Sequence, residues 1–477
     1  MTLIDVVVGV ALVSIVFLSL FGILRASLIL STLAKAEAGA TALAQTQMEY
    51  LRSLTYEDVG TVGGIPSGVV PQDATTTEDG IPYATHTFIE YVDDPADGLG
   101  ANDTNGITTD YKRARVEVSY AVGGRTHSVV LVTNFAPPGI ETSGGGGTLV
   151  INVVNAAGNP VADATVNILD ASTTPTVNIT TYTDTNGIVD LPGAATSSSY
   201  QVAVSRPGYS GAQTYARDAT NQNPNPGYLT VVQDQTTTQT FAIDVLSHLA
   251  LATYSPAATS TFADSFANTS KLASMSSTTV SGGMLSLLSG AASGSARSVA
   301  TSSSYLIRWG RLAATTTAPG GTTVALHVYD QNGSLVPDSV LPGNRTGFTS
   351  FPVNLESVST STYPSLSVGA TFSGDASSSP SVSAWSLSYL AGPFPLPNVS
   401  FTLTGSKTKG SESNGTPIPK TVVTSSTGSS GTQELTLEWD TYALTLPNYT
   451  IDVADPSPPF ALAPGATTTA SLILLPK

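Results

Sequence analysis

The 477-residue sequence contains no cysteine, and charged residues make up only 11% of it. The lack of cysteine excludes a disulfide framework and thiolate zinc sites. Only 18 residues are Lys or Arg against 34 Asp or Glu, and no basic cluster occurs, so nucleic acid is not expected as a partner. The few histidines lie far apart and predict no imidazole metal site: His86, His127, His248 and His327.

Signatures of catalysis are also missing. The sequence has no G-x-S-x-G elbow, P-loop, glycine-rich dinucleotide turn or H-E-x-x-H pair. We therefore expect no enzyme, no cofactor, and no catalytic or metal-ligating residue. The chain consists largely of Ser, Thr, Gly, Asn and Pro around a 41% hydrophobic fraction, which is typical of all-β domains with many turns. Its length predicts three or four domains.

One long apolar run stands at the N-terminus. From Val6 to Leu24 no residue is charged, and a helix of that length spans about 28 Å, close to the hydrocarbon thickness of a bilayer. Asp5 precedes the run, and a carboxylate inside hydrocarbon is costly unless it is paired. Two interpretations stay open. Either an α-amine, freed by removal of a basic leader before Met1, neutralises Asp5, or Asp5 lies outside the bilayer and caps the helix.

The first five residues, MTLID, followed by an apolar helix resemble the mature start of type IV pilins and of the pseudopilins of type II secretion and competence systems. The resemblance implies that a prepilin peptidase removes a leader, that Met1 is the processed, N-methylated terminus, and that Asp5 sets the register of each subunit in a filament. The family usually has Glu at the fifth position and often Pro near position 22. Here Gly22 occupies that position, which gives the hypothesis that the helix melts locally between Ser14 and Gly22 in a filament.

Beyond Arg25 the helical pattern continues with an apolar stripe at three- and four-residue steps, which predicts packing against a sheet. Glu49 and Arg52 are spaced to form an ion pair. The resemblance thus implies a pilin helix over 1–53, with 1–24 as the transmembrane segment and filament core. The stripe consists of Leu33, Ala36, Ala40, Leu43, Gln47, Leu51 and Leu54.

Strand-like alternation occurs in 83–92, 110–124 and 125–136, and the Gly123-Gly124 pair predicts a tight hairpin between the last two segments. A small antiparallel head sheet is therefore expected within 54–136, which gives an α+β pilin fold. The acidic loop 95–110 has two interpretations, a Ca²⁺ site or an ordinary turn-rich loop, and it lacks the ligand spacing of an EF-hand.

A Pro/Gly linker over 137–147 separates the head from the remaining domains. The segment 148–245 predicts strands around Asn/Gly turns, including a hairpin at 182–193. It resembles the carboxypeptidase regulatory-like and B-type repeat sandwiches of surface proteins. Some of those domains carry a Lys–Asn crosslink, which is impossible here because no Lys occurs between Lys112 and Lys271. The residues that carry the resemblance are Gly158, Pro160, Val161, Ala164, Gly187, Tyr200, Gly208 and Tyr209.

The Ser/Thr-rich region 246–392 resembles a jelly-roll-like β-sandwich. Its aromatic residues Trp309, Tyr329 and Trp385 are either glycan-stacking surfaces or core residues of alternating strands, and the second interpretation is favoured. The last region, 396–477, repeats the strand and turn pattern of 148–245 and is expected to be a second carboxypeptidase regulatory-like sandwich. Here an isopeptide crosslink stays open because lysines are present: Lys407, Lys409 and Lys420.

The expected function is a structural subunit of a type IV pilus-like filament that polymerises through its N-terminal helix and displays β-sandwich modules for attachment. The partners implied are copies of the chain itself, a prepilin peptidase, the pilus assembly machinery and the inner membrane before assembly, with surface glycans or a host cell as candidates for attachment. The expected location is an extracellular filament at the cell surface, with the cytoplasmic membrane as the location before assembly. Two alternatives stay open: a minor tip pilin acting as an adhesin, and a membrane-anchored surface protein that never polymerises.

Overall fold

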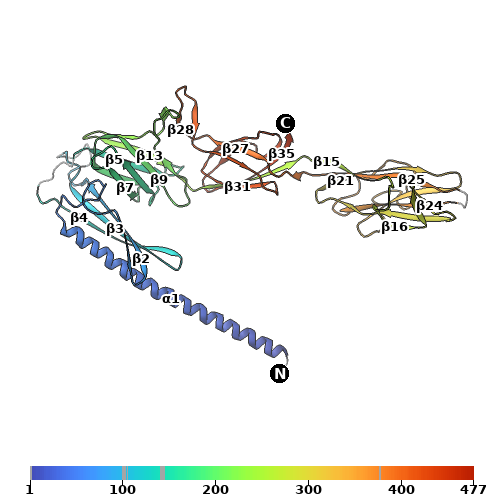
Figure 1. The fold of residues 1–477 in the computed structure, drawn as a ribbon, viewed down its shortest axis with the longest axis horizontal. Coiled ribbons are helices and arrows are strands. Elements are labelled where there is room, and N and C mark those ends of the chain that lie inside the picture. Colours follow the sequence, from blue (N-terminus) through green and yellow to red (C-terminus); the bar gives the residue numbers. More distant parts are fainter. Residues whose placement is uncertain (1–2, 99–103, 105, 140–144, 375–377) are drawn as a thin grey trace.

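A computed structural model describes residues 3–98, 104, 106–139, 145–374 and 378–477, with side chains in the first helix from residue 12 onward. One long helix is followed by β-sheets only, as expected for a helix plus β-sandwich domains. The chain forms an extended arm: the helix and head at one end, two sandwiches in the middle and a further β module at the other end (Figure 1). Met1 and parts of the loop 95–110 and of the linker 137–147 lie outside the described residues.

Helix α1 (Leu3–Ser53) is 51 residues long, about 77 Å at 1.5 Å per residue. It contains no proline, and Ala and Leu, which favour helices, are frequent in it. The predicted i,i+3 pair is present, since Arg52 Nη1 lies 2.7 Å from Glu49 Oε1. The helix ends where Leu54 N donates to Leu51 O and Ser53 Oγ donates to Tyr50 O.

The second half of α1 packs on a four-stranded antiparallel sheet, the head, in the order β1-β2-β3-β4. The predicted hairpin is confirmed, because Gly123 and Gly124 both adopt positive φ, +63° and +79°, between β3 and β4. β1, in the polar segment DATTTE, is a strand that the sequence pattern does not indicate. The strands are β1 (Asp73–Glu78), β2 (Ile81–Val92), β3 (Tyr111–Val122) and β4 (Arg125–Phe135).

A column of small residues lets the helix approach this sheet closely. Every fourth residue from Ala36 to Ala44 is fully buried, and the larger Met48 and Leu51 continue the column. Leu33, Leu43 and Leu54 of the predicted stripe flank the column and are partly buried, and Gln47 Nε2 donates to Thr87 Oγ1. The sheet contributes alternate side chains of β3 to the same core: Ala114, Val116, Val118 and Tyr120.

The first sandwich contains two sheets. β5 (Gly147–Val154) lies between β8 (Ile188–Ala194) and β13 (Thr236–Ala242) in one sheet. In the other, β6 (Thr165–Asp170) lies between β7 (Val177–Tyr182) and β9 (Ser197–Ser205), with β10 (Ala212–Gln213) and β12 (Leu229–Val231) beside β9. The hairpin predicted at 182–193 is therefore wrong. β7 and β8 belong to different sheets, because β7 pairs with β6 and β8 pairs with β5, so the turn between them crosses from one layer to the other.

The C-terminal sandwich has the same strand order but begins earlier than expected. β14 (Ser247–Ser255) pairs antiparallel with β31 (Thr432–Leu437) and parallel with β35 (Thr467–Pro476), as β5 pairs with β8 and β13. β14 is thus the first strand of this sandwich, and the boundary expected at 246 is corrected accordingly. The remaining strands are β26 (Phe394–Pro395), β27 (Ser400–Gly405), β28 (Thr408–Ser411), β29 (Pro417–Pro419), β30 (Val422–Ser426), β32 (Asp440–Thr445), β33 (Tyr449–Asp455) and β34 (Phe460–Leu462).

Residues 258–391 form a separate two-sheet module, the distal module, inserted between β14 and β27. It occupies the end of the arm farthest from the head (Figure 1). Trp309 and Trp385, 0% and 1% exposed, fill its core. Its strands are β15 (Ala258–Asp264), β16 (Leu272–Ser276), β17 (Thr278–Ser281), β18 (Met284–Leu287), β19 (Ser293–Ser298), β20 (Thr301–Ser302), β21 (Leu306–Thr317), β22 (Thr323–Tyr329), β23 (Val353–Asn354), β24 (Ser365–Ser373) and β25 (Ser381–Ala391).

Candidate assembly surface and the junctions of the arm

The first half of α1 projects beyond the head and presents apolar side chains on all its sides. Large apolar residues between Leu12 and Leu30 are 38–72% exposed, with Leu18 at the upper limit. Ser19 Oγ donates to Ile15 O at 2.8 Å and Thr32 Oγ1 to Leu28 O at 2.9 Å, so these hydroxyl groups are satisfied within the helix. By length and composition this helix is able to cross a membrane.

Two glycines show how differently the halves of α1 are surrounded. A Cβ added at Gly22 would meet no atom within 4 Å, whereas one at Gly39 would overlap the Tyr83 hydroxyl on β2. The chain is helical through Gly22. Because the melting hypothesis concerns the assembled filament, it stays a prediction, as do the roles of Met1 and Asp5. Asp5 belongs to α1, but only its backbone is among the described parts of the chain.

The face of the head sheet turned away from α1 packs on the first sandwich. Phe88 of β2 and Ile65 are part of the sandwich's own hydrophobic core. Polar contacts surround this apolar centre: His86 Nε2 lies 2.9 Å from Thr180 O, and His86 Nδ1 lies 2.8 Å from Asp73 Oδ1. The head and the first sandwich therefore share an interface on either side of the linker. The sequence pattern did not predict this interface, because the residues that meet in it are about a hundred positions apart.

Two carboxyl groups line a cavity of about 510 Å³ at this head–sandwich junction: that of Glu90, which is partly buried, and that of Asp190, which is exposed. Burial raises the pKa of Glu90 to about 7, although Arg113, 3.8 Å away, partly offsets the effect. The surrounding protein partly desolvates the Asp190 carboxyl group, and together with the negative charge of Asp93 this raises the pKa of Asp190 to about 6. The junction thus holds acids whose ionisation is disfavoured by their surroundings.

The two sandwiches are joined by a short strand pair. β11 (Asn223–Pro224) of the first sandwich pairs antiparallel with β28, and Asn225 N and Asn221 Nδ2 both donate to Lys409 O, at 3.1 and 3.0 Å. A side chain at Gly410 would collide with Asn221 and with the backbone of β11. The two sandwiches are therefore joined by backbone hydrogen bonds as well as by side-chain contacts.

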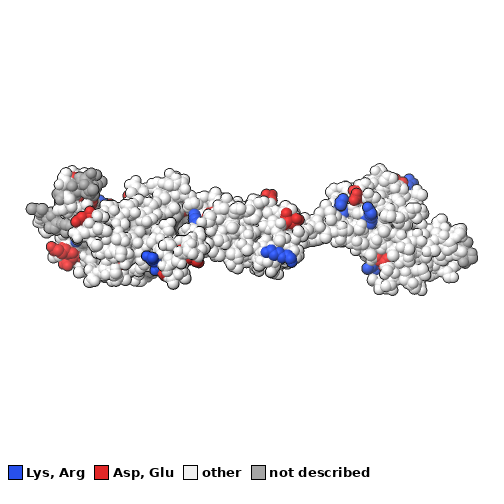
Figure 2. Space-filling view, turned by 90° about the horizontal axis from the view of Figure 1, so that it is seen from above, with Lys and Arg blue, Asp and Glu red and all other residues white. Residues whose placement is uncertain are grey.

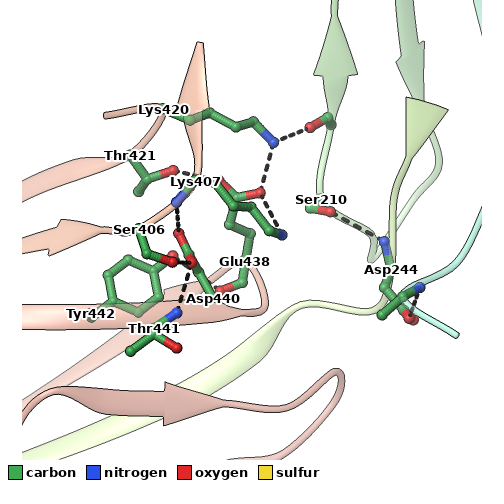
Figure 3. A network of polar contacts seen from close by, with 12 residues as sticks. Ser210, Asp244, Ser406, Lys407, Lys420, Thr421, Glu438, Asp440, Thr441 and Tyr442 are labelled. Atoms are coloured by element: carbon green, nitrogen blue, oxygen red, sulfur yellow. Dashed lines mark hydrogen bonds and ion pairs between the residues drawn. The ribbon is translucent and has the colours of Figure 1, made fainter. Parts of the chain in front are cut away.

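A buried acid, Glu438, lies at the centre of the polar network at the same junction (Figure 3). Its carboxylate lies 2.7 Å from Lys420 Nζ and 3.5 Å from Lys407 Nζ, and it accepts a hydrogen bond from Thr421 Oγ1. Lys420 Nζ also donates to Gly211 O of the first sandwich at 2.7 Å. The network therefore connects the two sandwiches through one amine.

Lys407 and Lys420 thus form ion pairs with a carboxylate, and Lys407 Nζ also lies 3.1 Å from the centre of the Trp439 ring. In this arrangement their amines face an acid. These contacts do not test whether one of the lysines forms the isopeptide crosslink that the sequence allows. The crosslink stays a prediction, which an intact mass measurement can check.

The aromatic residues considered for glycan stacking are core residues. Trp309 and Trp385 are buried, and Tyr329 is half-buried beside His327 and Arg297. The distal module therefore offers no stacking platform at the tryptophans. On the face seen in Figure 2, charged side chains are few and scattered over an otherwise uncharged surface.

No group of three or more metal-ligating side chains occurs within the described residues. Two of the four histidines, His86 and His127, belong to the head sheet, and the other two lie in different domains. His86 is at the head–sandwich junction, His127 stacks on Tyr120 of the head, His248 starts β14, and His327 is buried in the distal module.

Together these features define a class of architecture, a half-exposed apolar helix carrying an arm of β domains. No protein-family model matches the sequence, and no curated protein sequence matches it. Among solved structures, the chain is similar to the Bacillus anthracis TIE protein (9% identity, 85% of this chain and 73% of that one, TM-score 0.17). It is also similar to BcpA, the major pilin subunit of Bacillus cereus (8%, 69% and 99%, TM-score 0.14), and to a streptococcal ancillary pilin (9%, 75% and 75%, TM-score 0.16). At such TM-scores the similarity does not define a shared fold and carries no functional argument.

Proposed function

We propose that the chain is the structural subunit of a type IV pilus-like filament. The observation that carries the proposal is the change in exposure along α1: large apolar side chains are 38–72% exposed before residue 31, whereas the column from Ala36 to Leu51 is buried against the head sheet. Exposed apolar surface of this extent needs a membrane or another apolar surface to cover it. One helix satisfies both needs in turn, first in the bilayer and then against the helices of neighbouring subunits.

The proposal also assigns the head and the arm a place in the filament. α1 would form the filament core, and the head would sit on its outside because the sheet covers only the second half of the helix. The two sandwiches and the distal module would extend outward for attachment (Figure 1). Asp5 is proposed to pair with the amine of Met1 on a neighbouring chain, which fixes the axial offset between subunits.

The test is assembly by charge variants at position 5. Asp5→Ala and Asp5→Asn should abolish filaments while membrane insertion persists, whereas Asp5→Glu, which keeps the charge, should assemble. Glu37→Ala, an exposed acid on the same helix, is the matched control and should assemble normally. Electron microscopy of sheared filaments and membrane fractionation measure the two properties. Filaments at the unmodified level with Asp5→Ala would contradict the register role.

Two further outcomes separate the alternatives. Labelling of the distal module on intact cells should decorate the whole length of each filament if the chain is the main subunit. Label confined to filament ends would identify a tip adhesin, and label spread over the envelope without filaments would identify an anchored surface protein.

A further inference from the structure

The outer face of the first sandwich carries a groove of about 470 Å³, which lies within the range of about 300–1,000 Å³ typical of small-molecule sites. It runs across the sheet of β7, β6, β9 and β10 towards the loop 214–228. None of the described residues that line it is charged. A groove without charge does not match an anionic or cationic ligand, since neither charge would be compensated on desolvation.

The floor of the groove consists of two rows of side chains fixed by strand register. In one row Leu169 of β6 is paired with Asn178 of β7 and with Gln201 of β9. In the next row Ala203 of β9 is paired with Asn167 of β6 and with Gln213 of β10. Each row therefore has an apolar residue in the middle and primary amides on both sides.

These amides have capacity to bind a ligand. Asn167 Oδ1 accepts from Thr180 Oγ1 at 2.8 Å, but its amino group, and the side-chain amides of Gln201 and Gln213, form no hydrogen bond among the described residues. A primary amide provides two donors and one acceptor oxygen, so each can bind neighbouring hydroxyl groups that act as donor and acceptor together.

Two tyrosines from the loop 214–228 complete the groove. Tyr215 and Tyr228 both line it, and Tyr228 is 37% exposed. This loop is held in place by the C-terminal sandwich, because β11 within it pairs with β28. Tyr215 N also donates to Pro226 O at 2.8 Å, which ties the two ends of the loop together. The aromatic wall is thus fixed before any ligand arrives, which lowers the cost of binding.

We propose that this groove binds a neutral oligosaccharide. Sugars combine an apolar C–H face with hydroxyl groups at its edge, and the groove offers the complementary order: Leu169, Ala203 and the tyrosine rings for the C–H face, and amides for the hydroxyl groups. The proposal extends the attachment role of the arm. It concerns the single chain, so it can be tested whether or not the chain polymerises.

The experiment uses the full chain in a zwitterionic detergent without a sugar headgroup, applied to an array of neutral, sialylated and sulfated oligosaccharides. Neutral members should bind, and the double variant Gln201→Ala/Gln213→Ala should weaken the best of them about tenfold, the loss expected for two hydrogen bonds. Ala203→Arg, which places a long charged side chain in the floor, should abolish binding. Gln239→Ala and Gln433→Ala change partly exposed glutamines outside the groove and should bind as the unmodified chain does.

Circular dichroism of each variant verifies that the sandwich is folded, since all the changed side chains are at least partly exposed. The proposal is overturned by an array with no bound member, by binding restricted to acidic glycans, or by binding that both groove variants leave unchanged. Each of these outcomes leaves the filament role untouched, because assembly is scored separately with the variants at position 5.

Discussion

The first and the C-terminal sandwich share a strand order and differ in what interrupts it. In both, a central strand pairs antiparallel with one neighbour and parallel with the last strand of the domain. In both, a fully buried tyrosine ties the second sheet to the end of the preceding strand: Tyr200 Oη donates to Ala195 O at 2.9 Å, and Tyr442 Oη to Glu438 O at 3.0 Å. The two sandwiches thus share their strand pairing, the alternation of apolar residues along the strands, and one buried tyrosine hydroxyl group.

The connection after the first strand is where the two sandwiches diverge. The first has only the turn 155–164 there, and the C-terminal one has the whole distal module. The two crossings into the module lie side by side, because Tyr254 and Ser255 at the end of β14 pair with Pro395 and Phe394 of β26. An insertion whose ends are adjacent requires little change in the parent domain, which explains why the same sandwich tolerates it.

The polar residues differ as well. The C-terminal copy carries Glu438 with two lysines where it meets its neighbour, whereas the junction between the first copy and the head contains acids whose pKa is raised by desolvation. The copies thus keep their cores alike and vary the charges at their contacts. Four changes test how far this comparison holds.

Glu438→Gln should have the largest effect. It removes the anion between Lys407 and Lys420 and leaves two partly buried cations facing one another, at a cost of about 3 kcal/mol in the free energy of unfolding of the C-terminal sandwich. Hydrogen exchange of the β27 and β32 amides measures it. Glu434→Gln, an exposed acid of β31, is the control. Equal protection in both variants would show that the network does not stabilise the junction.

Glu90→Gln should act in the opposite direction and depend on pH. Because the pKa of Glu90 rises from 4.5 to about 7 on folding, the folded chain binds more protons between these values and loses stability as pH rises through them. The variant should be more stable than the unmodified chain by about 1–2 kcal/mol at pH 8 and equal to it at pH 4. Hydrogen exchange at β2 and β7 is the measurement, with exposed Glu78→Gln as control. A gain of the same size at both pH values would contradict the burial argument.

Tyr200→Phe and Tyr442→Phe test whether the two copies use their tyrosine alike. Each removes one buried hydroxyl and leaves its carbonyl partner unsatisfied, so each should cost its own sandwich about 1 kcal/mol. Urea titrations followed by hydrogen exchange separate the two domains. Unequal costs would mean that the hydroxyl has a different role in one copy.

Replacement of residues 257–392 by the turn 155–164 should have the smallest effect on the remaining fold. The C-terminal sandwich should keep its stability within about 1 kcal/mol, since the first sandwich folds with that connection and β14 retains its pairing with β31 and β35. Exchange protection of β14 provides the measurement. Loss of that protection would show that the distal module helps to fold its host.

Local patterns predict the elements whose partners are near in sequence. The helix with its Glu49–Arg52 pair, the Gly123-Gly124 hairpin and the likeness of the last domain to the first sandwich all follow from spacing and turn residues. Sequence patterns place the strand β14 in the wrong domain because its apolar alternation is the same whichever sheet it joins. Its partners lie roughly 180 residues later, beyond the inserted module.

The sequence alone thus determined that an apolar helix precedes a series of β domains, since hydrophobic periodicity is a local property of the chain. Only the tertiary structure decided which half of that helix is covered and which strand belongs to which sandwich. It also decided which residues surround Glu90, which surround Glu438, and which amides line the groove. These features depend on contacts between residues far apart along the chain, and a residue's type does not reveal the distant neighbour that gives it a role.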